Sequence, residues 1–390
     1  KVICKAGCFE LLLVLGGLSI LANIFRFRMV QQKKWSTLAF HAAILIILIG
    51  AGVTRYFSYE GTMHIREDST SNEIVLSDTY LLFEAHQNGK AYRFDEKVNF
   101  ASLGRNKFKE TYQIGNDVIE AELEAFIPNP ENILEPSPNG VPIIKIVIGG
   151  NNGREEYYLR DKDYENFNGS WFNFGNPERP DAFNIYYRND SLVLKSPEVL
   201  AHMVMATQKR DTVYPGVYTP LVVRSLYTGS KGNFAIGDFN PSAELMMKSS
   251  GPKMKSESVA ALKMKISING QPSEVFIYGN KGMEGEPEVV KGGNTELAVS
   301  YGAKRIQIPF GLKLRDFILD KYPGTESASS YASEVTLIDP RKNLNRDQRI
   351  YMNNILDYGG YRFFQSSYDQ DELGTVLSVN HDFWGTWISY

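Results

Sequence analysis

The hydrophobic pattern of the chain changes abruptly near residue 57. Before that point, two segments are almost continuously apolar, about 6–25 and 37–54. The second, Thr37–Thr54, has 18 residues without a formal charge, which is enough to cross the hydrocarbon core of a bilayer. A soluble amphipathic helix of that length would carry a polar stripe, and this segment has almost none. The pattern predicts a transmembrane helical hairpin within residues 1–57.

After residue 57, apolar and polar residues alternate in short runs separated by turn signals. Asn-Gly pairs at Asn88-Gly89, Asn152-Gly153 and Asn269-Gly270 each lie between two alternating runs, a strong signal for a β-hairpin. We therefore expect a large β-sandwich-like domain over 58–380. The final stretch, 381–390, is rich in aromatic residues and resembles the start of a further transmembrane helix.

One or two short helices are expected inside this β-rich domain. Ser196-Pro197-Glu198 offers an N-cap residue, a proline at the first helical position and an acid in the first turn, so a helix is predicted up to about Gln208. A second is predicted over 309–322, where Leu312, Phe317 and Leu319 are apolar. No linker divides the domain cleanly, although a boundary near 197–218 is an alternative. The predicted fold class is thus membrane-anchored and mainly β.

Charge gives the orientation of the hairpin. The loop between the apolar segments carries Arg26, Arg28, Lys33 and Lys34 and no acid, which predicts that it is cytoplasmic and that residues from about Phe57 lie outside. Six of the 42 basic residues and one of the 45 acids precede Trp35, so the remainder has 36 and 44 and a net charge of −8. An acidic domain of this kind gives no reason to expect nucleic acid as a partner.

The candidate chemistry is concentrated in one histidine. His41 lies inside the second apolar segment, where a polar group capable of binding metal is costly and is a functional candidate; a hydrogen-bonded helix contact is the alternative. His64 and His381 flank the predicted membrane segments and are weaker candidates for a site at the outer surface. His86 and His202 are expected to be solvated or structural.

Other catalytic signals are missing from the sequence. The two cysteines, Cys4 and Cys8, have neither the spacing of a redox dithiol nor that of a haem attachment site. Hydrolase, zinc-protease, nucleotide-binding and phosphate-loop motifs are absent as well. A metal held by His41 alone would lack ligands, so a second ligand would have to come from elsewhere.

Three blocks of sequence resemble the ResB/CcsB family of cytochrome c biogenesis proteins. They are FHAAILIILIGAGVTRYFSYEGTMHIRE, LKLRDFILDKYPGTESASSYASEVTLIDP and MNNILDYGGYRFFQSSYDQDELGTVLSVNHD, in the family's order, and the chain departs from the family's N-x-P-L in lacking the proline after Asn354. The resemblance implies a membrane protein of the bacterial cytoplasmic membrane with its large domain on the periplasmic side. It also implies that haem b is carried across the membrane, with His41 as an axial ligand of the haem iron, and attached to apocytochrome c.

The resemblance further implies partners. The second haem ligand would come from a CcsA-type tryptophan-rich membrane protein or a fused half, and the chain alone would be non-catalytic, as one part of a holocytochrome c synthase. We interpret the sequence as an internal piece of a longer protein. One form that fits is the N-terminal half of a chain in which the ResB/CcsB and CcsA parts are fused. Two other functions compete with this one: a membrane-anchored β-domain that binds or senses a partner without a cofactor, and a hydrolase at the outer surface.

Overall fold

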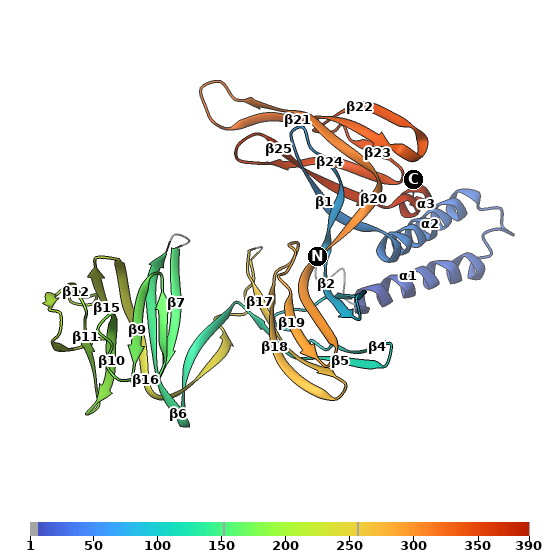
Figure 1. The fold of residues 1–390 in the computed structure, drawn as a ribbon. Helices are drawn as coiled ribbons and strands as arrows, with labels where there is room; N and C mark the ends of the chain where they lie inside the picture. The colour runs from blue at the N-terminus through green and yellow to red at the C-terminus, as the bar shows by residue number, and fades with distance from the viewer. Residues whose placement is uncertain (1–6, 151–152, 256, 390) are drawn as a thin grey trace. The chain divides into compact units, whose positions relative to one another are not determined.

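The computed structural model describes residues 7–150, 153–255 and 257–389, and it is mainly β with three helices (Figure 1). The helices are α1 (Gly7–Arg26), α2 (Trp35–Phe57) and α3 (Phe383–Ser389). The first two contain the expected apolar segments, and both are long and apolar enough to cross a membrane. No residue of Cys8–Arg26 is buried, and within α2 only Gly50 is. Their apolar surface is therefore free to contact lipid.

The β-rich part of the chain divides into two compact units. Unit 1 comprises the residues up to Asn129 together with those from Gly251 onward, and unit 2 comprises Pro130–Ser250. Unit 2 is an insertion between two neighbouring strands of unit 1, β5 and β17, which pair with each other. The segment 197–218, the alternative boundary, lies inside unit 2.

Unit 1 contains a ten-stranded sheet. Its path runs β22-β21-β20-β2-β1-β25-β24-β23, with β3 paired to β2 and β19 paired to β20. The strands are β1 (Tyr59–Arg66), β2 (Thr70–Gln87), β3 (Lys90–Val98), β19 (Glu288–Gly292), β20 (Thr295–Lys321), β21 (Ala328–Asp339), β22 (Leu344–Tyr351), β23 (Leu356–Tyr358), β24 (Tyr361–Tyr368) and β25 (Gly374–His381). Strands from one end of this path to the other, β22 to β23, contribute side chains to one buried core, so the sheet curls around it.

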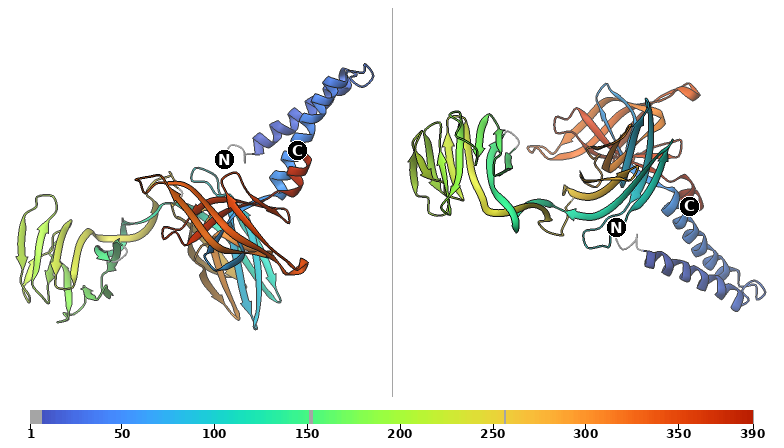
Figure 2. Two further views of the ribbon diagram at one scale, coloured as in Figure 1. Left: turned by 90° about the horizontal axis from the view of Figure 1, so that it is seen from above. Right: turned by 60° about the horizontal axis from the view of Figure 1, so that its bottom comes forward.

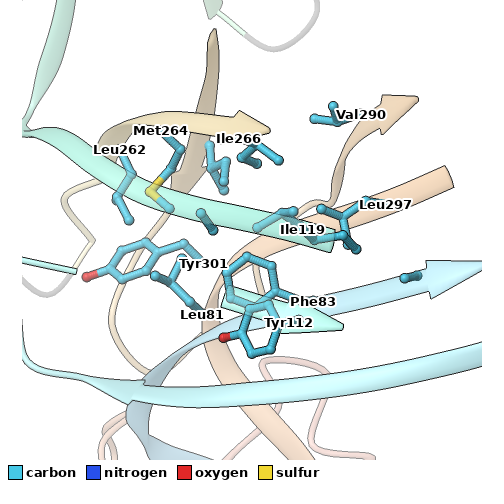
Figure 3. Packing of buried hydrophobic residues seen from close by; sticks show 14 of the residues in the cluster. Leu81, Phe83, Tyr112, Ile119, Leu262, Met264, Ile266, Val290, Leu297 and Tyr301 are labelled. Carbon is cyan, nitrogen blue, oxygen red and sulfur yellow. The ribbon is translucent and has the colours of Figure 1, made fainter. Parts of the chain in front are cut away.

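Two long strands, β2 and β20, extend from that core into a second one. Their pairing shifts register between Val75 and Thr79, and beyond that irregularity they face a smaller sheet. Its order is β18-β17-β5-β4, with β4 (Lys109–Ile114), β5 (Asp117–Pro128), β17 (Ala260–Ile268) and β18 (Gln271–Gly279). Figure 3 shows side chains of the two sheets meeting in this core, with the hydroxyl of Tyr301 directed away from Leu81 and Phe83. This part of unit 1 is a sandwich, as the alternating pattern predicts.

Unit 2 is a second sandwich, visible in both views of Figure 2. A six-stranded sheet has the order β13-β12-β15-β16-β6-β7, and a five-stranded sheet has the order β14-β11-β10-β9-β8. The strands are β6 (Pro130–Gly150), β7 (Gly153–Arg160), β8 (Tyr164–Phe167), β9 (Ser170–Phe174), β10 (Ala182–Arg188), β11 (Ser191–Lys195), β12 (Leu200–Val204), β13 (Arg210–Val213), β14 (Tyr218–Pro220), β15 (Ser225–Gly229) and β16 (Gly232–Ser249). Phe172, Phe183 and Phe234 from the two sheets contact one another in the shared core.

The predicted hairpins are confirmed. Gln87 pairs with Lys90 across Asn88-Gly89, and Ile268 pairs with Gln271 across Asn269-Gly270. In the third hairpin Gly150 pairs with Gly153, and Asn152 lies outside the described residues. The mainly β fold with a membrane hairpin is therefore as expected.

The two short helices predicted inside the β-rich region are wrong. Residues 309–321 belong to β20, and 196–208 form a turn followed by β12 and a second turn. Ser196 does accept a hydrogen bond from the amide of Glu198, as an N-cap residue would, but its hydroxyl also donates to the carbonyl of Glu198, and a strand begins at Leu200. Between α2 and α3, the helical structure in the described residues is limited to one three-residue 3-10 turn, Pro340–Lys342.

Candidate functional site

The two membrane helices are joined at the end where α2 enters the β-rich region. Arg55 Nε donates a hydrogen bond of 2.8 Å to Glu10, and the Tyr56 hydroxyl donates one of 3.1 Å to the other oxygen of that carboxylate. Farther along, a side chain built on Gly17 would contact Leu48 and Leu45, so this glycine lies against α2 while Gly16 faces open space. These contacts align α1 and α2 antiparallel, as a hairpin through one bilayer requires.

His41 lies near the opposite end of α2. It is six residues after Trp35, hence roughly 9 Å along the helix axis, and roughly 24 Å from Phe57. Its Nδ1 is 2.8 Å from the carbonyl oxygen of Thr37, one turn earlier. Because a carbonyl oxygen only accepts, Nδ1 carries the hydrogen, and Nε2 is the ring nitrogen left to face the surroundings of the helix.

The contact between His41 and Thr37 fixes the orientation of the ring on the helix. Histidines that ligate metals usually donate their other N–H to a carbonyl or carboxylate, which fixes the orientation of the ring. The neighbouring Phe40 is 65% exposed and meets the imidazole edge to face, with ring centroids 6.0 Å apart. The neighbouring residues of α2 are mainly apolar. Among the described residues, no cluster of three or more His, Cys, Asp or Glu side chains that could hold a metal ion exists.

A second set of polar and aromatic residues lies where the helices meet the sheet. Tyr59, the first residue of β1, stacks on His381, the last residue of β25, with ring centroids 4.7 Å apart. Tyr361 contacts the same imidazole at 4.4 Å, and its hydroxyl is 2.8 Å from that of Tyr59. Burial lowers the pKa of His381 and raises that of Tyr59, so both rings stay neutral near pH 7.

The same junction ties α3 to α2. The Thr54 hydroxyl donates a hydrogen bond of 2.7 Å to Asp382, and Asp382 also accepts one from the amide of Gly385 in the first turn of α3. The C-terminal residues are thereby held beside the end of α2, near the surface of the membrane that α2 is long enough to cross. Whether α3 begins a further transmembrane helix stays a prediction, and Tyr390 lies outside the described residues.

His64 is not part of this junction. It pairs across the strands with Val376, five residues before His381, which places the two histidines roughly 17 Å apart along β25. His64 Nε2 contacts Asp369 at 2.9 Å, and Arg66 bridges Asp369 and Asp371 at 2.7 Å each. Burial alone would raise the pKa of Asp369, but hydrogen bonds from His64 and Arg66 lower it, and Arg66 lowers the pKa of Asp371 to about 2. The cluster is a structural ion-pair network at a strand end.

The remaining histidines are also explained by their neighbours. His86 is exposed and lies 3.0 Å from Glu84 on the same strand, as expected for a solvated hairpin residue. His202 is in strand β12, stacked on Tyr227, where burial lowers its pKa. The structure therefore brings none of the five histidines together.

Sequence reasoning missed two contacts at the junction. The pair of Glu10 and Arg55 was not predicted, although opposite charges at the same end of two antiparallel spans are a signal for such a pair. Tyr59 and Tyr361 carry no motif of their own, because only the register of β1, β25 and β24 brings them to His381. Cys8 is exposed, and its neighbour in the sequence pattern, Cys4, lies outside the described residues.

Fold and site together define a membrane-anchored, mainly β protein with a histidine on the surface of a membrane helix. Comparison with known families matches residues 31–117 and 259–385 to the ResB-like family, and the chain belongs to that family, one of cytochrome c biogenesis proteins. Protein NrfI of Wolinella succinogenes is 48% identical over 87 residues. That stretch covers 22% of this chain and 10% of NrfI. The family match leaves out 118–258, which includes all of unit 2.

Proposed function

We propose that this protein is the ResB/CcsB-type part of an assembly that carries haem across the membrane and supports its attachment to apocytochrome c. His41 is the axial ligand that this chain contributes to the haem iron. The observation that carries the proposal is the fixed imidazole of His41, with Nδ1 bonded to Thr37 and the Nε2 lone pair on an apolar helix surface. Membership in the ResB-like family supports the role in cytochrome c biogenesis.

Each part of the chain has a physical task in this proposal. The neutral imidazole donates its lone pair to the iron, while the apolar surfaces of α1 and α2 face either lipid or the flat, apolar cargo. The second axial ligand comes from a CcsA-type partner or fused half, since His41 is the only histidine in the two spans. The attachment chemistry then belongs to the assembly, and this chain alone is non-catalytic.

The orientation follows from the loop between α1 and α2. Its four cations keep it in the cytoplasm, which places His41 toward the side where haem is made available and the β-rich units in the periplasm of a bacterial cell. A cysteine introduced beside the exposed Asn88-Gly89 turn, in a chain without its two natural cysteines, should react with a membrane-impermeant maleimide in intact spheroplasts. Reaction only after lysis would reverse the assigned side.

The test of His41 uses the complete assembly expressed with a c-type apocytochrome. His41→Ala should lose the haem absorbance of the purified complex and most of the yield of holocytochrome, and imidazole added to the medium should restore part of both. His86→Ala is the matched control, because His86 is exposed and remote from the helices. Unchanged haem content in His41→Ala would reject the assignment. A complex that is colourless in the unaltered form as well would favour the binding or sensor function.

A further inference from the structure

A cleft of about 590 Å³ opens in unit 1 beside the end of α2. Arg55, from the last turn of α2, lines it together with residues of β2, β3, β18 and β20 and the loop before β17. Because α2 is long enough to cross a bilayer, this cleft lies at the level of the membrane surface. Its volume is in the range of small-molecule sites.

The charge of the cleft is opposite to that of the surrounding domain. Four cations line it, against a single carboxylate, Asp78, which already pairs with Lys97. Arg55 is likewise neutralised by Glu10. The other two cations, Lys255 and Lys281, are exposed, and no acid lies near enough to either to form an ion pair within the described part of the chain. In a chain that carries a net charge of −8 after Trp35, two uncompensated lysines at one cleft favour an anion.

The floor of the same cleft is apolar. Phe100, Phe126 and Tyr301 form a cluster of rings with centroids 5.8 to 6.4 Å apart, and Met254 lies beside them. The loop that follows Phe100 exposes Leu103 to 89%, with Arg105 and Lys107 close behind it in sequence. An exposed leucine flanked by cations is a disadvantage in water, but it fits the boundary between lipid headgroups and acyl chains.

We propose that this cleft binds an anionic phospholipid of the leaflet that faces the β-rich region. The phosphate lies between Lys255 and Lys281, an acyl chain covers the rings of Phe100, Phe126 and Tyr301, and Leu103 enters the interface beside it. Clusters of Lys and Arg at a membrane surface recognise anionic headgroups in this way. The lipid thereby fixes the height of unit 1 above the membrane, and this does not depend on what His41 binds.

The test uses the full chain, purified in a neutral detergent and titrated with phosphatidylglycerol or phosphatidylcholine, with bound lipid counted by native mass spectrometry. Phosphatidylglycerol should bind more tightly. The variant Lys255→Gln/Lys281→Gln should weaken it roughly 30-fold, about five-fold for each cation, and should leave phosphatidylcholine unchanged. Lys90→Gln/Lys265→Gln, two exposed lysines outside the cleft, is the charge-matched control and should bind like the unaltered chain.

Three results would overturn the proposal. Equal binding of the two lipids would mean that the cations do not select a headgroup. Equal weakening in the control variant would mean that net charge, and not the cleft, is responsible. Competition by inorganic phosphate or by haem at the concentration of the lipid would assign the cleft to a free anion or to the cargo; the Soret absorbance of haem distinguishes those two. Thermal unfolding of each variant verifies that the fold is retained.

Discussion

Gly61 is the third residue of β1, the strand that connects α2 to the main sheet, and its replacement by alanine tests the closest strand contact there. A Cβ at this position would lie 2.5 Å from Ile74 Cγ2 and 2.5 Å from the carbonyl oxygen of Val75. Ordinary contacts of a carbon atom begin near 3.5 Å, so β1 and β2 would have to separate by about 1 Å. The register pairs Gly61–Leu76 and Thr62–Val75 lie at this point.

The expected cost follows from the atoms involved. Overpacking a well-formed core costs about 1 to 3 kcal/mol, and the upper end applies because one of the two clashing atoms belongs to the backbone of a central strand. For a unit of this size, about 3 kcal/mol lowers the melting temperature by roughly 6 to 12 °C. Thermal unfolding of the full chain in detergent, followed by intrinsic fluorescence, measures this shift.

The control for this substitution is Gly149→Ala. Gly149 also lies in a strand, β6, but a side chain built there meets no atom within 4 Å. Its alanine variant should melt within a degree or two of the unaltered chain, since surface substitutions usually change stability by less than about 0.5 kcal/mol. If Gly61→Ala melts like Gly149→Ala, then β1 and β2 are not as close as described, and the argument for this junction fails.

Three further predictions concern the core and the junction. Phe363→Ala removes a ring that is fully buried in unit 1 and should lower the free energy of unfolding by about 3 to 5 kcal/mol in a denaturant titration, whereas Phe364→Ala, on the outward face of the same strand and 38% exposed, should have a much smaller effect. Burial lowers the pKa of His381 below its ordinary value of 6.5, so the unfolded chain takes up its proton first, and stability should be intact above about pH 6.5 and fall as the pH drops below it. The pKa of the partly buried His202 is lowered in the same way, so His381→Gln should reduce, and not abolish, the dependence of the melting temperature on pH in that window. The lowered pKa values of Asp369 and Asp371 act only below their ordinary value of 3.8, which keeps the two effects apart. In α1 and α2, Glu10→Gln and Arg55→Gln should each lower the melting temperature, and the double variant should be no worse than the worse single one; additive losses would show that the two side chains do not pair.

Local turn chemistry made the hairpins predictable. At Asn88 and Gly89 the backbone φ angles are +49° and +75°, a conformation that asparagine and glycine adopt most readily, so the dipeptide itself specifies the turn. The membrane hairpin was predictable for a similar reason, because an uncharged apolar run of 18 residues has few soluble alternatives. In both cases the information lies within a few adjacent residues.

The two false helices show where such local information fails. In β20, buried residues alternate at Phe310, Leu312 and Leu314, and an irregularity in pairing between Leu314 and Asp316 then moves the buried side to Phe317. This phase shift made the apolar spacing look helical. Near Ser196 the capping residues were real, but the serine uses its hydroxyl in a two-residue turn. Tertiary pairing, which the sequence does not display, decided both segments.

The site was only partly predictable for the same reason. His41 was found because a single histidine in an apolar span is unusual on its own. The partners of His381 are Tyr59 of β1 and Tyr361 of β24, which are 322 and 20 residues away in the chain, and only strand register brings them together. The cleft beside Arg55 has lining residues from seven separate segments and left no pattern in the sequence.

The chain leaves unit 1 for unit 2 and returns to it at two neighbouring positions. Asn129 Nδ2 donates a hydrogen bond of 2.8 Å to the carbonyl oxygen of Gly251, and the flanking strands pair directly through Pro128 and Ala260. Entry and exit of the 121-residue insertion, Pro130–Ser250, are therefore neighbours, and a short turn can join them without disturbing a strand. The family match ends at residue 117 and resumes at residue 259, so it leaves out the insertion. Unit 2 is in this sense a cassette: the strands on either side of it, β5 and β17, pair with each other without any contribution from it.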